Sequence, residues 1–425
     1  AHIGDDQVTA DKLANSINTA IAANTAKTGI TSSQANAITA NTAKTGISSA
    51  QTSKLSGIEA SATADQTAAQ IKAHVTLQTT ATSNIGLGST AVDSITTGDY
   101  NVGVGANALT ATTTGDENVA IGFRALLTNT TGSDNCAYGS GALQLATTAD
   151  NNTAMGKDAA YANTTGTNNT AIGKSAMYTN TTGNNNTALG LNALDANTTG
   201  SENYAGGFNA LGANTTASNN TAVGSRALLT NTTGAENTAV GRNAMYSNTT
   251  GANNTSLGRE SLEANTTASN NTAIGKAALK ANTTGAANVA IGYRSLQANT
   301  TASSNTAVGT DSLVSNTTGT SNTAIGRDTL NQQTTASYNT AVGHQASNLN
   351  TTGDHITALG YGALKANTTA SNNTSVGSEA LTANTTGGQN TAIGTEALKD
   401  NTTGYSNVAV GRQALTDNTT GFENT

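Results

Sequence analysis

Small apolar and polar residues alternate in one unit that recurs every 17 residues over most of the chain. A clean copy begins with Asn169-Thr-Ala-Ile-Gly173 and ends with Asn180-Thr-Thr-Gly183. The glycine of the first word recurs twenty times without a slip, as at Gly156, Gly173, Gly190, Gly224 and Gly241. A strict period without insertions is typical of a solenoid, in which each repeat packs only on its neighbours. The sequence therefore predicts stacked coils rather than a globular domain.

Within each unit, the pattern predicts a strand, a bend, a second strand and a turn. Thr170 and Ile172 lie two residues apart and so on one face of a strand, and β-branched residues favour that structure. The glycine that follows permits a tight bend or a close approach of two backbones. Ala193-Leu194 predicts the second short strand, with its leucine inward. Asn-Thr-Thr-Gly predicts the turn back, since asparagine tolerates the left-handed conformations of turns.

The asparagine that opens each unit predicts a stacked ladder of amides. It is present at 20 of 21 positions, for example at Asn169, Asn186 and Asn220, and only Ile356 departs from it. Stacked coils align identical residues about 4.8 Å apart, which lets each amide bond the next one. This uniformity favours a structural role for the asparagines over a binding role.

One isoleucine and one leucine in each coil are too little apolar surface for an isolated coil to bury. A chain this thin leaves one face of its apolar column near water, and closed symmetric association covers such a face. We therefore predict a mainly β fold, a parallel β-solenoid of about twenty coils over residues 84–425. Its predicted assembly is a homotrimeric fibre.

Residues 1–83 lack the full repeat and predict a helical, coiled-coil-like stalk with a linker. Thr9 is placed to cap a helix that carries Leu13, Ile17 and Ile21 along one face. Such short helices are marginal in water alone, but a parallel trimer would bury their apolar residues.

Composition agrees with a thin repetitive fold. Only 3% of the 425 residues are aromatic, and tryptophan and proline are absent, so a thick core of large side chains is excluded. The strict spacing and the low charged fraction argue against disorder. The net charge of −7 includes no basic run, which disfavours a nucleic-acid partner. No apolar stretch approaches the roughly 20 residues that span a bilayer, so no membrane insertion is expected.

No motif for catalysis, cofactor binding or metal binding emerges. The four histidines are scattered, and Cys136 is the single cysteine, which disfavours a zinc site. Cys136 replaces a threonine of the repeat and is interpreted as a small side chain in a column. The Gly-x-Gly words belong to the repeat and lack the context of a nucleotide-binding loop. We expect no enzymatic activity and no cofactor.

Two resemblances extend these expectations. The word Asn-Thr-Ala-Ile-Gly-x-x-Ala-Leu resembles the head repeats of trimeric autotransporter adhesins, which implies a left-handed parallel β-roll and association of three chains. The segment 55–71, with the Asn-Thr-Ala-Lys-Thr-Gly-Ile words before it, resembles tail-fibre proteins of aquatic bacteriophages. That likeness implies a homotrimer whose far end touches the host.

These observations predict a structural fibre protein, either a bacteriophage tail fibre or another virion appendage that mediates host attachment. Its expected partners are its own copies and a host cell-surface receptor or glycan. The alternative is a bacterial trimeric surface adhesin or extracellular filament, located at the cell surface. A third hypothesis is an ice- or polysaccharide-binding solenoid, because Thr181-Thr182 and its equivalents would stack into two rows of hydroxyls.

The two residues after each glycine vary most and form the candidate contact ribbon. The residues singled out on it are Phe123, Tyr293, Arg294 and Tyr361.

Overall fold

The structure is a computed structural model that describes residues 75–76 and 83–425. The stalk predicted over residues 1–83 lies outside the described residues, apart from residues 75–76 and 83. The described residues belong to one compact unit, Ala73–Thr425.

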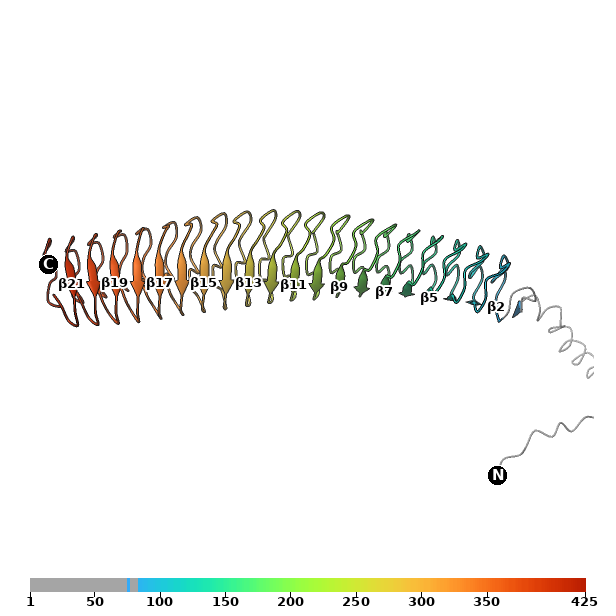
Figure 1. Ribbon diagram of the computed structural model, residues 1–425, viewed down its shortest axis with the longest axis horizontal. Helices are drawn as coiled ribbons and strands as arrows, with labels where there is room; N and C mark the ends of the chain where they lie inside the picture. Colours follow the sequence, from blue (N-terminus) through green and yellow to red (C-terminus); the bar gives the residue numbers. More distant parts are fainter. Residues whose placement is uncertain (1–74, 77–82) are drawn as a thin grey trace, which may run out of the picture. The chain divides into compact units, whose positions relative to one another are not determined.

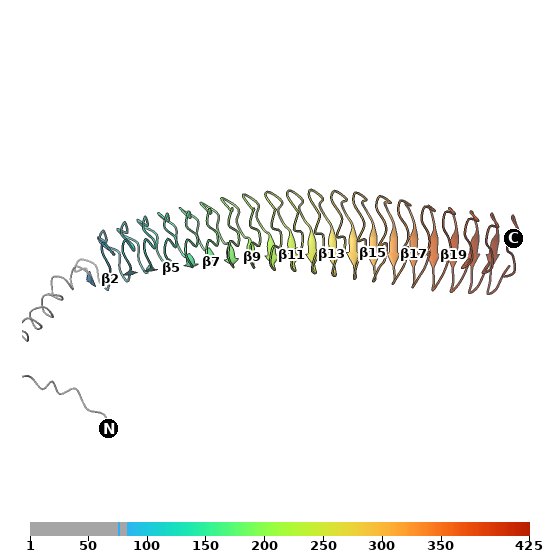
Figure 2. The ribbon, with the colours of Figure 1, turned by 180° about the vertical axis from the view of Figure 1, so that it is seen from behind.

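This unit is a parallel β-solenoid, as the period predicts. Each 17-residue coil contributes one strand of three residues, and successive strands pair parallel and in register, as Thr170 pairs with Thr187. The coils follow one another along a single axis, and both views show the strands in one row (Figures 1 and 2).

The strands of the row share the same length and the same place in the repeat. They are β2 (Ile85–Leu87), β3 (Val102–Val104), β4 (Val119–Ile121), β5 (Cys136–Tyr138), β6 (Thr153–Met155), β7 (Thr170–Ile172), β8 (Thr187–Leu189), β9 (Tyr204–Gly206), β10 (Thr221–Val223), β11 (Thr238–Val240), β12 (Thr255–Leu257), β13 (Thr272–Ile274), β14 (Val289–Ile291), β15 (Thr306–Val308), β16 (Thr323–Ile325), β17 (Thr340–Val342), β18 (Thr357–Leu359), β19 (Thr374–Val376), β20 (Thr391–Ile393) and β21 (Val408–Val410).

A separate short strand covers the first edge of the row. β1 (Val75–Thr76) pairs antiparallel with β2, with Val75 opposite Leu87 and Thr76 opposite Gly86. An open edge of a sheet presents unpaired N–H and C=O groups that recruit other chains. This antiparallel strand occupies those groups at the N-terminal end of the solenoid.

The core of each coil is small and rests on alanine and leucine. In β7 the middle residue Ala171 is fully buried, whereas Thr170 and Ile172 on either side point outward. The second inward column holds Ala193 and Leu194, which are also fully buried. The solenoid interior is therefore lined by the small residue of each strand.

The predicted second strand is wrong, although its leucine does point inward. Asn192 and Leu194 adopt left-handed backbone conformations, with φ of 53° and 55°, and the segment is a turn. A strand would carry the chain straight on, whereas paired left-handed residues reverse it within a few residues. The coil can therefore close with its leucine held at the inner side of a sharp corner.

The repeated glycine both bends the chain and lets adjacent coils approach closely. Gly173 has a φ of 132°, a region that L side chains rarely adopt, and a Cβ there would lie 2.5 Å from the carbonyl oxygen of Gly190. The sequence predicted either a bend or a close approach of two backbones at this glycine, and the structure shows both.

The asparagine of Asn-Thr-Thr-Gly has a different role from the predicted one. Asn180 is buried and is not left-handed; its Nδ2 donates to the carbonyl oxygen of Gly183 at 3.1 Å and to Oδ1 of Asn163 in the preceding coil at 2.7 Å. Its side chain, rather than its backbone freedom, holds the turn. This asparagine forms a second inner ladder.

We predict that Gly173→Ala destabilises the solenoid by about 2 kcal/mol or more, because it combines a disfavoured φ with a backbone clash. Gly183→Ala is the matched control for the backbone conformation: a Cβ there would also closely approach a carbonyl oxygen, that of Gly200, but Gly183 has no positive φ and Ala217 fills the equivalent position naturally. Thermal unfolding followed by circular dichroism compares the two. Equal melting temperatures for both variants would contradict the role assigned to Gly173.

Candidate functional site

The opening asparagines form the predicted ladder inside the solenoid. The backbone N–H of Asn186 donates to Oδ1 of Asn169 at 2.9 Å, and its Nδ2 donates to the carbonyl oxygen of Gly200 at 2.9 Å. One bond joins the preceding coil, and the other closes the asparagine's own coil. At the single exception, Ile356 is buried and its N–H still donates to Oδ1 of Asn339. The asparagine column is therefore structural and not available to a ligand.

The outward side chains of strands β2–β21 form two parallel rows, which together we call the strand stripe. The first residue of each strand is Thr in 13 of 20 coils, whereas the last residue is Ile, Leu, Val or Met in 18 of 20, so the second row is the apolar one. Ile172 is 39% exposed and Leu257 is 47% exposed, although both are large apolar side chains. The expectation that one apolar column stays near water is confirmed for the isolated chain.

Exposure of this kind recurs along the row of strands, and the remaining outward apolar residues are partly exposed. Its clearest members are Ile85, Leu87, Met155, Ile172, Val223, Leu257, Ile325, Ile393, Val408 and Val410. Contiguous apolar patches of this extent mark interaction surfaces in soluble proteins.

The predicted contact ribbon lies beside the stripe, but its named residues do not form one cluster. Tyr293 and Arg294 are neighbours, and the guanidinium of Arg294 lies 4.9 Å from the centre of the Tyr293 ring. Phe123 lies ten coils before Tyr293, against Arg124, and Tyr361 lies four coils after it, against His344. All three aromatic rings are exposed.

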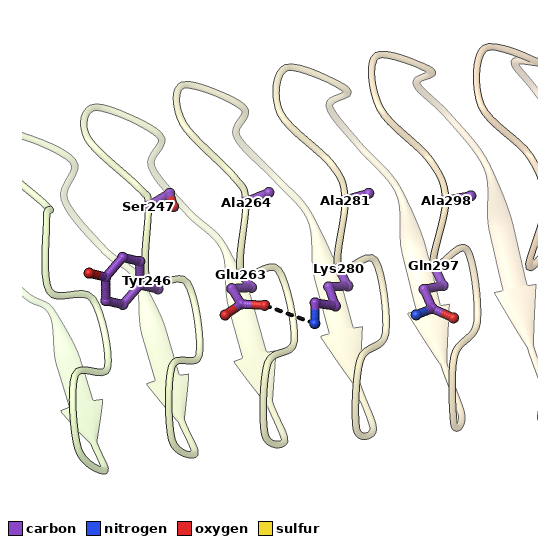
Figure 3. A pocket seen from close by; sticks show the side chains of 8 residues that line it. All are labelled: Tyr246, Ser247, Glu263, Ala264, Lys280, Ala281, Gln297 and Ala298. Carbon is purple, nitrogen blue, oxygen red and sulfur yellow. Dashed lines mark ion pairs between the residues drawn. The ribbon is translucent and has the colours of Figure 1, made fainter.

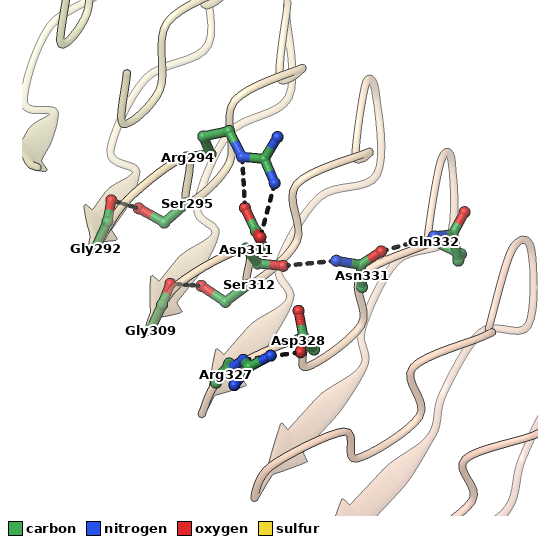
Figure 4. Close-up of polar contacts among 10 residues, drawn as sticks. All are labelled: Gly292, Arg294, Ser295, Gly309, Asp311, Ser312, Arg327, Asp328, Asn331 and Gln332. Carbon is green, nitrogen blue, oxygen red and sulfur yellow. Dashed lines mark hydrogen bonds and ion pairs between the residues drawn. The ribbon is translucent and has the colours of Figure 1, made fainter. Parts of the chain in front are cut away.

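Arg294 is already engaged within the chain. Its Nε and Nη2 donate to the two carboxylate oxygens of Asp311 in the next coil at 2.7 and 2.8 Å (Figure 4). This bidentate bond with Asp311 raises the pKa of Arg294 above its usual value. The ribbon therefore carries axial ion pairs between coils, and Arg294 is better explained as part of one than as a free contact residue.

A shallow groove on another side of the coils escaped the sequence analysis. Figure 3 shows its lining, with Tyr246, Glu263, Lys280 and Gln297 in one row and Ser247, Ala264, Ala281 and Ala298 in the next. Its volume is about 650 Å³. These residues occupy variable positions of the repeat, so only the three-dimensional structure brings out the hollow that they share.

The groove's charges are mutually neutralised. Lys280 Nζ lies 2.9 Å from Oε2 of Glu260 and 3.2 Å from Oε2 of Glu263. The hydrogen bond from Lys280, with a second from Arg259, lowers the pKa of Glu260 to about 2. The groove thus offers an aromatic ring and an amide beside a satisfied ion-pair cluster, with no unpaired charge to draw in a ligand.

The two threonine rows are not equivalent. Thr181 Oγ1 donates to the carbonyl oxygen of Thr198 in the next coil at 2.9 Å, and this bond repeats along the solenoid, whereas Thr182 is exposed. In the described coils, only the second row presents its hydroxyl donors to the surface. The hypothesis of a surface lattice built from two rows of threonine hydroxyls is therefore less well supported.

Within residues 75–76 and 83–425, no three His, Cys, Asp or Glu side chains gather closely enough to hold a metal ion. The same residues contain no helix long and apolar enough to cross a membrane. The sequence matches no protein-family model, and no curated protein matches it.

We predict that Asn203→Ile destabilises the solenoid by about 1–3 kcal/mol, because the buried N–H of Asn220 loses its acceptor, Oδ1 of Asn203. Isoleucine is the informative replacement, since Ile356 shows that this column accommodates it. Chemical unfolding of both proteins measures the difference. An unchanged unfolding midpoint would mean that the ladder contributes shape but no stability.

A second prediction concerns acid. Because the folded pKa of Glu260 lies below its reference of 4.5, its contribution to stability is present above pH 4.5 and is lost as the pH falls to about 2. Glu260→Gln should therefore lower the melting temperature near neutral pH, with a difference that shrinks towards pH 2. Thermal melts across this range test it. Asp400→Asn is the control, because Asp400 is exposed and no ion pair of Asp400 is found within the described range.

Proposed function

We propose that this chain forms the shaft of a homotrimeric structural fibre, a bacteriophage tail fibre or other virion appendage that mediates attachment to a host cell. The observation that carries the proposal is the strand stripe, whose exposed or partly exposed apolar row recurs in 18 of 20 coils. A fibre of one chain would leave this surface in water. Association of identical chains buries it without requiring a second kind of chain.

Cyclic closure explains why the stripe is so regular. Every coil presents the same outward positions, so a rotation axis parallel to the solenoid buries all of them at once. Closure around the axis also ends the association at a fixed number of chains. The resemblance of the repeat word to trimeric fibre families favours three chains.

The mechanical role follows from the bonds along the axis. Strand pairing, both asparagine ladders and the threonine hydroxyls all connect each coil to the next one. Bonds of this kind resist bending and stretching along the whole row. The shaft would therefore act through reach and stiffness, with a host receptor or glycan met at the fibre's far end.

The alternative is a bacterial trimeric surface adhesin or extracellular filament. The same stripe and the likeness to adhesin head repeats support it. Antibodies against the chain distinguish the two: gold label on cell-free particles would favour the virion, and label on bacterial envelopes would favour the adhesin. The ice- or polysaccharide-binding hypothesis is less well supported, because the hydroxyls of one threonine row already donate to backbone carbonyls.

We expect the full chain to have the mass of three chains by light scattering. Replacing Ile172, Ile274 and Ile325 by glutamate should lower the melting temperature of the assembly and promote its dissociation on dilution, because charges would enter the buried stripe. Glutamate at Thr182, Thr284 and Thr335, which are exposed in the turn, is the matched control. A wild-type mass of one chain would overturn the proposal.

A further inference from the structure

The strand stripe is bordered on one side by a row of positive charge. This basic border is the residue directly after each repeated glycine; it is Lys or Arg in 7 of 20 coils and never Asp or Glu. Every cation of the row is exposed. The cations are Lys157, Lys174, Arg242, Arg259, Lys276, Arg327 and Arg412.

The opposite side of the stripe carries negative charge. The acidic border consists of the two residues directly before each ladder asparagine, and it contains nine acidic residues and no Lys or Arg. The acids are Asp99, Asp116, Glu117, Asp134, Asp150, Glu202, Glu236, Asp354 and Glu423. The two borders lie at opposite ends of each strand, because one precedes it and the other follows its glycine bend.

Some of these charges are already engaged within the chain, since Asp116, Asp150 and Asp354 accept hydrogen bonds from backbone N–H groups of the preceding coil. Lys157, Arg259 and Arg327 reach an acidic neighbour in the same coil. In the part of the chain that the structure describes, Arg242 and Glu236 form no ion pair. The same holds there for Lys174 and Glu202. Charge is therefore available along both borders for contacts with another chain.

The order of charges across the stripe distinguishes between two ways of covering it. When two copies run antiparallel, a two-fold axis across the stripe places acidic border on acidic border and basic on basic. When copies run parallel around a common axis, the basic border of each chain faces the acidic border of the next. Like charges across an interface are unfavourable and opposite charges fix its orientation, so the parallel arrangement is selected.

The positions of the charges along the solenoid axis also favour one register between neighbouring chains. Arg242 and Glu236 flank the same strand, β11, and Glu423 lies less than one coil beyond Arg412. One coil is about 4.8 Å, which a long side chain spans easily. Chains at equal height therefore bring these cations near these acids.

We propose that the strand stripe is covered by a second copy of this chain that runs parallel and in register, with ionic seams between the basic border of one copy and the acidic border of the next. This inference rests on the proposed fibre and specifies its contacts. The seams would give direction and register to an apolar stripe that, being nearly uniform, supplies little of either.

Cys136 provides a built-in reporter of this arrangement. It lies at the outward-facing start of β5, on the strand stripe, and is half-buried. In parallel chains at equal height, the Cys136 side chains meet around the axis. In an antiparallel pair centred on the solenoid they would lie more than ten coils apart, on the order of 50 Å or more.

The test treats the native full chain with a short bifunctional maleimide and separates the denatured products. A covalent dimer is expected from the wild type. No dimer is expected from Cys136→Ser, or from Cys136→Ser with Thr148→Cys, which moves the thiol to an exposed turn of the same coil. A native mass of three chains without Cys136 cross-linking would overturn the seams and leave the fibre standing. A native mass of one chain would overturn both.

A charge exchange tests the seams themselves. Glu236→Arg should speed dissociation of the assembly about two- to fivefold, the range expected for an exposed ion pair, and adding Arg242→Glu should restore the wild-type rate. Both effects should fade in 1 M salt, where charges are screened within about 3 Å. Losses that simply add in the double variant would contradict the pairing.

Discussion

The buried amides of the asparagine columns are the constraint on which the rest of the structure depends. A carbonyl or N–H inside a core of alanine and leucine is costly unless it is paired, and a coil this small cannot pair them all alone. Asn186 meets the requirement by bonding Asn169 in the preceding coil and Gly200 in its own. Each coil is thus complete only between two others of equal length, which explains why the period never slips.

A departure from the asparagine ladder shows what a missing amide leaves unpaired. Asn129 belongs to the second ladder, but the next coil carries Ala146 in place of asparagine. Oδ1 of Asn129 is consequently buried without a hydrogen-bond partner among the described residues. A single missing amide leaves the defect in one coil, because the strand pairing and the first ladder continue past it. Redundancy along the axis makes the rod tolerant of such substitutions.

The period, the parallel strand, the asparagine ladder and the inward leucine could all be predicted from the sequence, because each leaves a signal at fixed spacing. The second strand was mispredicted since Ala193-Leu194 suits a strand locally, while closing a coil of 17 residues requires the left-handed corner at Leu194. The role of Asn180 was missed for a related reason. Residue preferences for turns describe the backbone, whereas this side chain is held by atoms of the preceding coil.

Surfaces were harder to predict than the interior. The groove around Tyr246 and Lys280 is built from positions that vary between coils, so no regular spacing in the sequence predicts it. The strand stripe, by contrast, is periodic, and its apolar character was visible, but only the structure shows that Ala171 faces in while Ile172 faces out. That inversion is physically informative. The interior accepts only a small residue at the strand, so the large apolar residue of the strand lies outside, while the leucine at the corner of the coil lies inside. Under the proposed association, the outward residues would form a second core shared between copies and kept in register by charges at its borders.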